Sequence, residues 1–169
     1  IKYTSFEAEN NGGWTYSPAG IVATFSPTGK KCYDLGLAAL TMTPAQSITK
    51  PVLLTLWSTQ SQVTINAGTL YQPTKTGPTI NGWTYLEFEL PSVTGTITVQ
   101  GTGKVDEVRL APKSARMTTY TYEPGFGKTS ECDANNRIVY YEYDAFGRIK
   151  TIKDQYKNLI KAYEYNYKQ

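Results

Sequence analysis

The sequence has no histidine, and this absence excludes more chemistry than any other feature of its composition. Histidine is the usual general base, a common metal ligand and the partner of the nucleophile in serine and cysteine hydrolases. Two carboxylates on one predicted strand, Glu87 and Glu89, are the remaining candidates for a glycosidase pair. Both would lie on the same face of the strand and would be equally solvated, so no difference in environment would separate their pKa values. We therefore predict that the chain is not an enzyme.

Long apolar runs and concentrated charge are also missing. The longest apolar stretch, residues 52–57, is far shorter than the roughly 20 residues of a membrane helix, so we expect no membrane span. Residues 1–113 hold 8 basic and 7 acidic side chains and residues 114–169 hold 9 and 7. This even distribution contains no basic run, so we expect no nucleic-acid partner. The N-terminus lacks the layout of a signal peptide, and we interpret the chain as a piece of a longer one.

The sequence has only two cysteines, Cys32 and Cys132. Their wide separation excludes a CxxC redox pair and a zinc knuckle. Two alternatives stay open at this point. The cysteines form a disulfide that joins the two halves of the chain, or they are two unrelated buried thiols.

Residues 1–113 are rich in short β-branched and aromatic segments separated by glycine, proline and asparagine clusters. No segment keeps a 3.6-residue apolar period over the length of a helix. We predict eight strands, near residues 4–8, 20–26, 31–37, 51–58, 61–66, 82–90, 95–100 and 105–111. Strands without crossover helices favour an antiparallel jelly-roll β-sandwich over a parallel sheet.

Alternation in segment 83–90 identifies a candidate binding face. We assign three apolar side chains to the buried face: Leu86, Phe88 and Leu90. The other face then carries aromatic rings beside a carboxylate, which is the chemistry of a sugar-binding surface. The predicted glycan-binding residues are Trp57, Trp83, Tyr85 and Glu87. In the alternative interpretation, these aromatic residues cover the sheet against a loop or against the C-terminal repeats.

Four segments of this half resemble the ends and the third strand of jelly-roll carbohydrate-binding modules with a galactose-binding-like fold. The segments are Ser5-Phe6-Glu7, Gly13-Trp14, residues 28–35 and residues 105–110. The resemblance implies a structural calcium ion that ties the first strand to the last. Its ligands would be Glu7 and Asp106, and carboxylate oxygens suit calcium.

Residues 114–169 contain a repeat. The segments 120–123, 141–144 and 163–166 share alternating tyrosines and are spaced by 21 and 22 residues. A glycine, an aspartate and an asparagine follow the first two of these segments before the next tyrosines. This period predicts one β-hairpin per repeat, with glycine, aspartate and asparagine at the turns. The tyrosines, nine of the 14 in the chain, are expected to form cross-strand ladders.

The segment Tyr143-Asp144-Ala145-Phe146-Gly147-Arg148-Ile149 resembles the YD repeat of Rhs-type proteins. The first repeat departs from that pattern, because Glu123-Pro124 replaces the aspartate step and Lys128 replaces arginine. About two repeats are too few to close the shell that long arrays form. The resemblance implies the C-terminal part of a large secreted bacterial surface protein.

Two function classes follow. The chain is expected to be a non-catalytic, extracellular or cell-surface module that binds a polysaccharide or mediates adhesion. Alternatively, it is a structural or export-targeting C-terminal domain, similar to type IX sorting domains, whose partner is the preceding part of its own chain. The exposure of the predicted aromatic platform should distinguish the two.

Overall fold

The computed structural model describes residues 1–166 and divides the chain into two compact units. Unit 1 comprises Ile1–Ala115, and unit 2 begins at Arg116. Within residues 1–166, the regular structure is β-strand apart from one short 3₁₀ helix, η1 (Pro18–Gly20). Across the described residues, we find no helix with the length and apolar character needed to cross a membrane. The predicted all-β class is confirmed.

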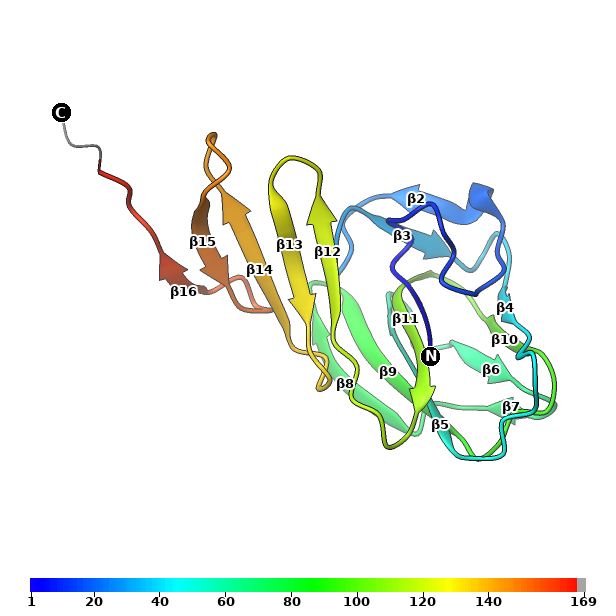
Figure 1. Cartoon of the computed structure of the whole chain (residues 1–169). Coiled ribbons are helices and arrows are strands. Elements are labelled where there is room, and N and C mark those ends of the chain that lie inside the picture. The colour runs from blue at the N-terminus through cyan, green and yellow to red at the C-terminus, as the bar shows by residue number, and fades with distance from the viewer. Residues whose placement is uncertain (167–169) are drawn as a thin grey trace. The chain divides into compact units, whose positions relative to one another are not determined.

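Unit 1 is built from two antiparallel sheets (Figure 1). Its strands are β1 (Lys2–Thr4), β2 (Ile21–Ala23), β3 (Lys31–Asp34), β4 (Leu40–Met42), β5 (Val52–Ser58), β6 (Thr64–Asn66), β7 (Leu70–Tyr71), β8 (Lys75–Ile80), β9 (Trp83–Leu90), β10 (Ile97–Gln100) and β11 (Lys104–Pro112). The larger sheet has the order β2-β3-β11-β5-β9-β8, and β1 also pairs with β11. The smaller sheet has the order β4-β10-β6-β7.

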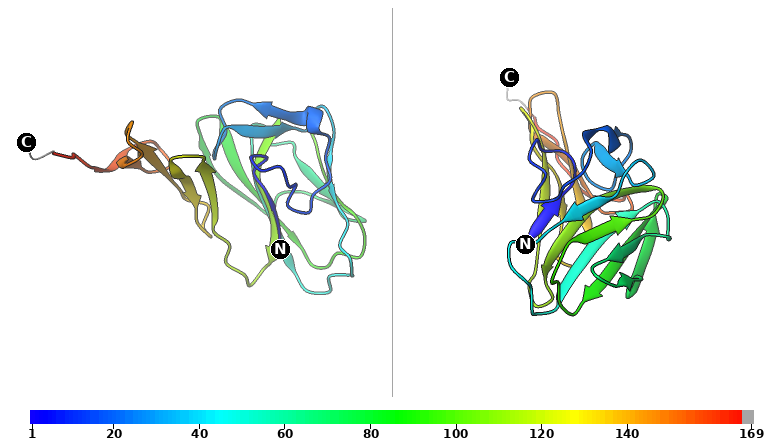
Figure 2. Two further views of the ribbon diagram at one scale, coloured as in Figure 1. Left: turned by 45° about the horizontal axis from the view of Figure 1, so that its top comes forward. Right: turned by 90° about the vertical axis from the view of Figure 1, so that its right-hand side faces the viewer.

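The hydrophobic core of unit 1 lies between these two sheets, in a sandwich-like arrangement (Figure 2). Leu86, Phe88 and Leu90 are almost completely buried in this core, as the alternation predicted. The smaller sheet contributes Ile97 and Val99 from β10. Burying each such side chain contributes about 1.5–3 kcal/mol. This core fixes which face of each strand points outward.

Three strands of unit 1 were not predicted. β8 contains Gly77 and Pro78, which indicated a turn in the sequence. It is an edge strand with an irregular register between Thr76 and Thr79. Proline is tolerated at such positions because a residue that faces the open edge needs no N–H group to pair with a neighbouring strand. β4 and β7 have three and two residues, too few to show alternation.

The described part of unit 2 forms a five-stranded antiparallel sheet in which each strand pairs with the next along the chain (Figure 1). The strands are β12 (Thr119–Glu123), β13 (Gly127–Cys132), β14 (Ile138–Tyr143), β15 (Ile149–Lys153) and β16 (Leu159–Ala162). Three connecting turns share one geometry. In each turn an aspartate Oδ1 accepts the N–H groups of the second and fourth following residues at 2.8–3.0 Å. These aspartates are Asp133, Asp144 and Asp154.

The third residue after each of these aspartates has a positive φ, at Asn136, Gly147 and Lys157. Glycine and asparagine accept this conformation readily, whereas lysine adopts it rarely. The shared aspartate therefore holds the turn even where the third residue is unfavourable. The sequence period of 21 to 22 residues corresponds to two such strand-and-turn steps.

The tyrosines of unit 2 contact backbone carbonyl groups and cationic side chains. The Tyr143 hydroxyl donates to the Lys128 carbonyl at 2.7 Å, and the Tyr165 hydroxyl donates to the Ile149 carbonyl at 2.9 Å. The Arg148 guanidinium lies 4.1 Å from the centre of the Tyr165 ring. The same kind of contact thus recurs from one repeat to the next. Tyr167, the last tyrosine, lies outside the described residues.

Candidate functional site

The four predicted glycan-binding residues lie together on β5 and β9, but the three aromatic rings among them are not open to solvent. Trp57, Trp83 and Tyr85 are 1%, 3% and 5% exposed. Trp57 and Tyr85 are cross-strand partners with ring centres 5.8 Å apart. The Tyr85 hydroxyl donates to Glu87 Oε2 at 3.1 Å. A buried ring cannot stack on a sugar, so this face does not provide the expected platform.

The two predicted calcium ligands meet at one turn, residues 28–31. Glu7 Oε1 accepts the N–H groups of Lys30, at 2.6 Å, and Lys31, at 2.5 Å. Asp106 Oδ2 accepts the N–H of Thr28 at 3.1 Å and lies 3.3 Å from the Thr28 hydroxyl oxygen. The first and last parts of unit 1 are therefore joined through this turn by hydrogen bonds.

Gly29 allows the turn to approach Glu7 closely. Its φ is +65°, and a Cβ placed there would lie 2.4 Å from the Glu7 Oε1 atom. Any side chain at this position would displace the carboxylate and lose its two amide contacts. The close approach of Glu7 therefore explains why position 29 is a glycine.

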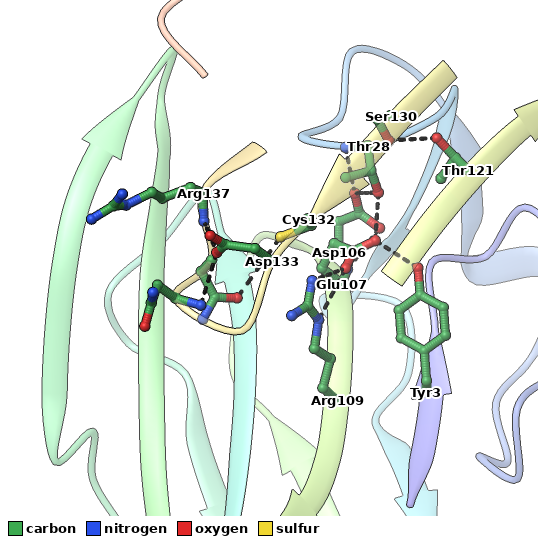
Figure 3. A network of polar contacts seen from close by, with 12 residues as sticks. Tyr3, Thr28, Asp106, Glu107, Arg109, Thr121, Ser130, Cys132, Asp133 and Arg137 are labelled. Carbon is green, nitrogen blue, oxygen red and sulfur yellow. Dashed lines mark hydrogen bonds and ion pairs between the residues drawn. The ribbon is translucent and has the colours of Figure 1, made fainter. Parts of the chain in front are cut away.

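Glu107 extends this arrangement into a buried polar network, drawn in Figure 3. Its Oε1 accepts the hydroxyl groups of Tyr3 and Thr28 at 2.6 and 2.7 Å. Its Oε2 accepts the Arg109 guanidinium at 2.7 Å. Asp106, Glu107 and Arg109 are at most 4% exposed. Buried charges persist only when paired in this way.

A bulge in β11 explains how two neighbouring carboxylates reach the same turn. Consecutive strand residues normally point to opposite faces. The register of β11 against β5 shifts between Asp106 and Arg109, and Glu107 has a φ of +53°. Both carboxylates therefore contact Thr28. Sequence reasoning missed Glu107 as a site residue, although charged residues inside the apolar segment 105–110 were a visible signal.

The network changes the acidity of its members. Burial, and then the nearby Glu107 charge, raise the pKa of Asp106 well above its usual value. Burial and the Glu107 charge also raise the pKa of Tyr3, so its hydroxyl stays protonated and donates. The network therefore disfavours a second negative charge at Asp106.

Glu7 and Asp106 are also the predicted calcium ligands. Asp106 and Glu7 offer carboxylate oxygens, which suit calcium. Asp106 Oδ1 also accepts the Glu107 N–H at 2.7 Å, so both Asp106 oxygens take hydrogen bonds from the protein. The part of the chain that the structure describes contains no group of three or more His, Cys, Asp or Glu residues able to hold a metal. The calcium ion stays a prediction.

Beside Glu7, the N-terminal loops form an open pocket of about 330 Å³. The residues whose chemistry matters here are Glu7, Glu9, Asn11, Tyr16, Ile21 and Lys31. We call this space the N-terminal pocket. It combines a partly exposed aromatic ring with two carboxylates, an amide and an ammonium group.

Phe6 organises the wall of the N-terminal pocket. Its φ is +62°, and its N–H donates to Thr4 Oγ1 at 3.1 Å. Its buried ring lies 5.3 Å from the ring of Tyr16 and 5.4 Å from that of Tyr33. The Tyr16 ring thereby packs against the core through edge-type and tilted contacts with Phe6 and Tyr33. The turn at Phe6 then directs Glu7 toward the pocket.

Both cysteines are buried thiols. Burial raises the pKa of the Cys32 thiol to about 12. Reactive cysteines need a lowered pKa and exposure, so Cys32 has the properties of a structural thiol.

Comparison with known proteins leaves the site to be interpreted from its own geometry. No protein-family model matches the chain, and no curated protein matches it.

Proposed function

We propose that this chain is a non-catalytic module of a larger secreted bacterial cell-surface protein, and that unit 1 binds a saccharide in the N-terminal pocket. The observation that carries the proposal is the partly exposed Tyr16 ring beside Glu7, Glu9 and Asn11. An aromatic ring stacks on the C–H face of a sugar, while carboxylates and amides take up its hydroxyl groups. The two-sheet architecture and the jelly-roll resemblance support the same role.

This proposal moves the binding site from the outer face of β5 and β9 to the N-terminal loops. Loops presented by a rigid scaffold commonly carry binding residues. Here the pocket residues are held in place by the rest of unit 1. The backbone N–H groups of Lys30 and Lys31 bind the Glu7 carboxylate, and the Phe6 ring packs on Tyr33.

A glycan array followed by calorimetry on the best ligand tests the proposal. Tyr16→Ala should weaken binding about tenfold, or about 1.4 kcal/mol, because the stacking ring is removed. Tyr71→Ala is the matched control, since Tyr71 also packs on the core but does not line the pocket. The screen should be run with calcium and with a chelator, to test the predicted ion at Glu7 and Asp106. Equal losses in the two variants, or no binding to any glycan, would reject the pocket.

The second candidate is a structural or export-targeting module. The observation that favours it is the repetition in unit 2, where three aspartate turns and two tyrosine–carbonyl contacts recur. Such repetition agrees with the YD-repeat resemblance of residues 143–149. A structural role predicts a folded chain that binds no glycan. An export role predicts that a reporter protein carrying this chain at its C-terminus reaches the cell surface in a bacterium with type IX secretion.

A further inference from the structure

We propose that β16 is an interface through which two copies of this chain pair edge to edge. β16 ends the sheet of unit 2, and among the strands of residues 1–166 only β15 pairs with it. All four of its residues are exposed, and Leu159 and Ile160 are each 59% exposed. An exposed apolar edge strand is a template for pairing with another strand.

The open edge of β16 presents backbone groups in a definite order. The Tyr163 N–H donates to the Lys150 carbonyl at 2.9 Å, so the backbone N–H of Tyr163 faces β15. Neighbouring residues in an antiparallel strand point their N–H and C=O groups to opposite sides. The N–H and C=O of Ala162 therefore face the open edge.

Charge and register select a second copy as the partner. Two identical strands pair antiparallel about a two-fold axis, which lies at one residue or between two. An axis at Lys161 would place two ammonium groups directly opposite each other, which is unfavourable. An axis at Ala162 instead places each Lys161 opposite Tyr163 of the second copy. This contact suits both groups, because the Lys161 ammonium already lies 4.6 Å from the Tyr163 ring of its own chain.

The register centred on Ala162 is also consistent with the backbone. A residue whose N–H and C=O both face the open edge forms a hydrogen-bonded pair with its counterpart. Ala162 adds no side chain large enough to separate the strands. The resulting sheet would continue from one chain into the next without placing like charges opposite each other.

A cysteine cross-link tests the register. In a hydrogen-bonded antiparallel pair the Cα atoms lie about 5.5 Å apart, within the range of about 4.4–6.8 Å that a disulfide spans. Ala162→Cys should therefore give a covalent dimer under mild oxidation, reversible by reductant. Ala145→Cys is the control, because Ala145 is exposed in the β14–β15 turn. Cys32 and Cys132 are buried and should not contribute.

Sedimentation of the uncross-linked chain tests the interface itself. The unmodified chain should shift from monomer to dimer as its concentration rises. Ala162→Lys should weaken this dimerisation at least tenfold, since two new ammonium groups would meet at the axis, whereas Ala145→Lys should leave it unchanged. Circular dichroism should show that both variants fold. A monomer at all concentrations, a dimer that Ala162→Lys retains, or cross-linking no better than at Ala145 would overturn the proposal.

Discussion

At the scale of single residues, Glu107 shows how one backbone conformation sets the chemistry of a region. A positive φ at a residue other than glycine costs about 1–3 kcal/mol and persists only where the surroundings compensate. Here the compensation is visible, because the Glu107 carboxylate accepts Tyr3, Thr28 and Arg109. Hydrogen bonds to charged groups contribute about 1.5–3 kcal/mol each. Two of these three partners, Tyr3 and Thr28, are far from Glu107 in the sequence, so long-range contacts help to maintain the conformation.

Removing this carboxylate should be strongly destabilising. Glu107→Ala leaves the buried Arg109 charge without this partner and should cost about 3–5 kcal/mol of unfolding free energy. The control is Glu89→Ala, which breaks the exposed pair with Lys113 and should cost less than about 1 kcal/mol. Urea unfolding followed by tryptophan fluorescence measures both. Similar losses in the two variants would show that the buried network does not stabilise the fold.

At the scale of elements, the aspartate turns explain why the sheet of unit 2 repeats. Asp144 accepts the N–H groups of Phe146 and Arg148 and pairs with the Arg148 guanidinium at 2.7 Å. The same backbone geometry recurs at Asp133 and Asp154. One aspartate therefore sets the direction in which the next strand leaves each turn. The strands need little else in common, and their facing residues differ.

These turns give the sheet a dependence on acid. The N–H and guanidinium of Arg148 and the N–H of Phe146 lower the pKa of Asp144 in the folded chain. Because the folded pKa lies below the unfolded one, the stabilisation is complete above about pH 4 and is lost as the pH falls through the folded value. Asp144→Asn keeps the Oδ1 acceptor but not the charge, so it should be less stable than the natural chain at neutral pH. This difference should shrink at about pH 3.

Urea unfolding of both chains across this pH range measures the effect. Glu164→Gln removes a carboxylate outside the turn and serves as the control, with a pH profile close to that of the natural chain. If the difference between Asp144→Asn and the natural chain is the same at both pH values, the charge of Asp144 does not stabilise the turn.

At the scale of the whole molecule, the parts that could be predicted from sequence are those with a short period. The alternation in residues 83–90 correctly assigned the buried face of β9, and the composition of the chain correctly predicted antiparallel β-structure. The N-terminal pocket was not predicted, because it depends on the positive φ of Phe6 and on loops without periodicity. The burial of Trp57 could not be predicted either. Alternation separates the two faces of a strand, but it does not show whether the outer face is covered.

The distribution of buried apolar residues leads to the last prediction. The main core lies entirely within unit 1, whereas in the described part of unit 2 the buried hydrophobic residues are Cys132 and Ile138. A sheet without a buried apolar layer has little to offset its chain entropy. Residues 1–115 alone should therefore melt cooperatively, while residues 116–169 alone should give the circular dichroism of an unfolded or aggregating peptide. A soluble second fragment with a cooperative melt would show that the turns and tyrosine contacts suffice to fold the repeats.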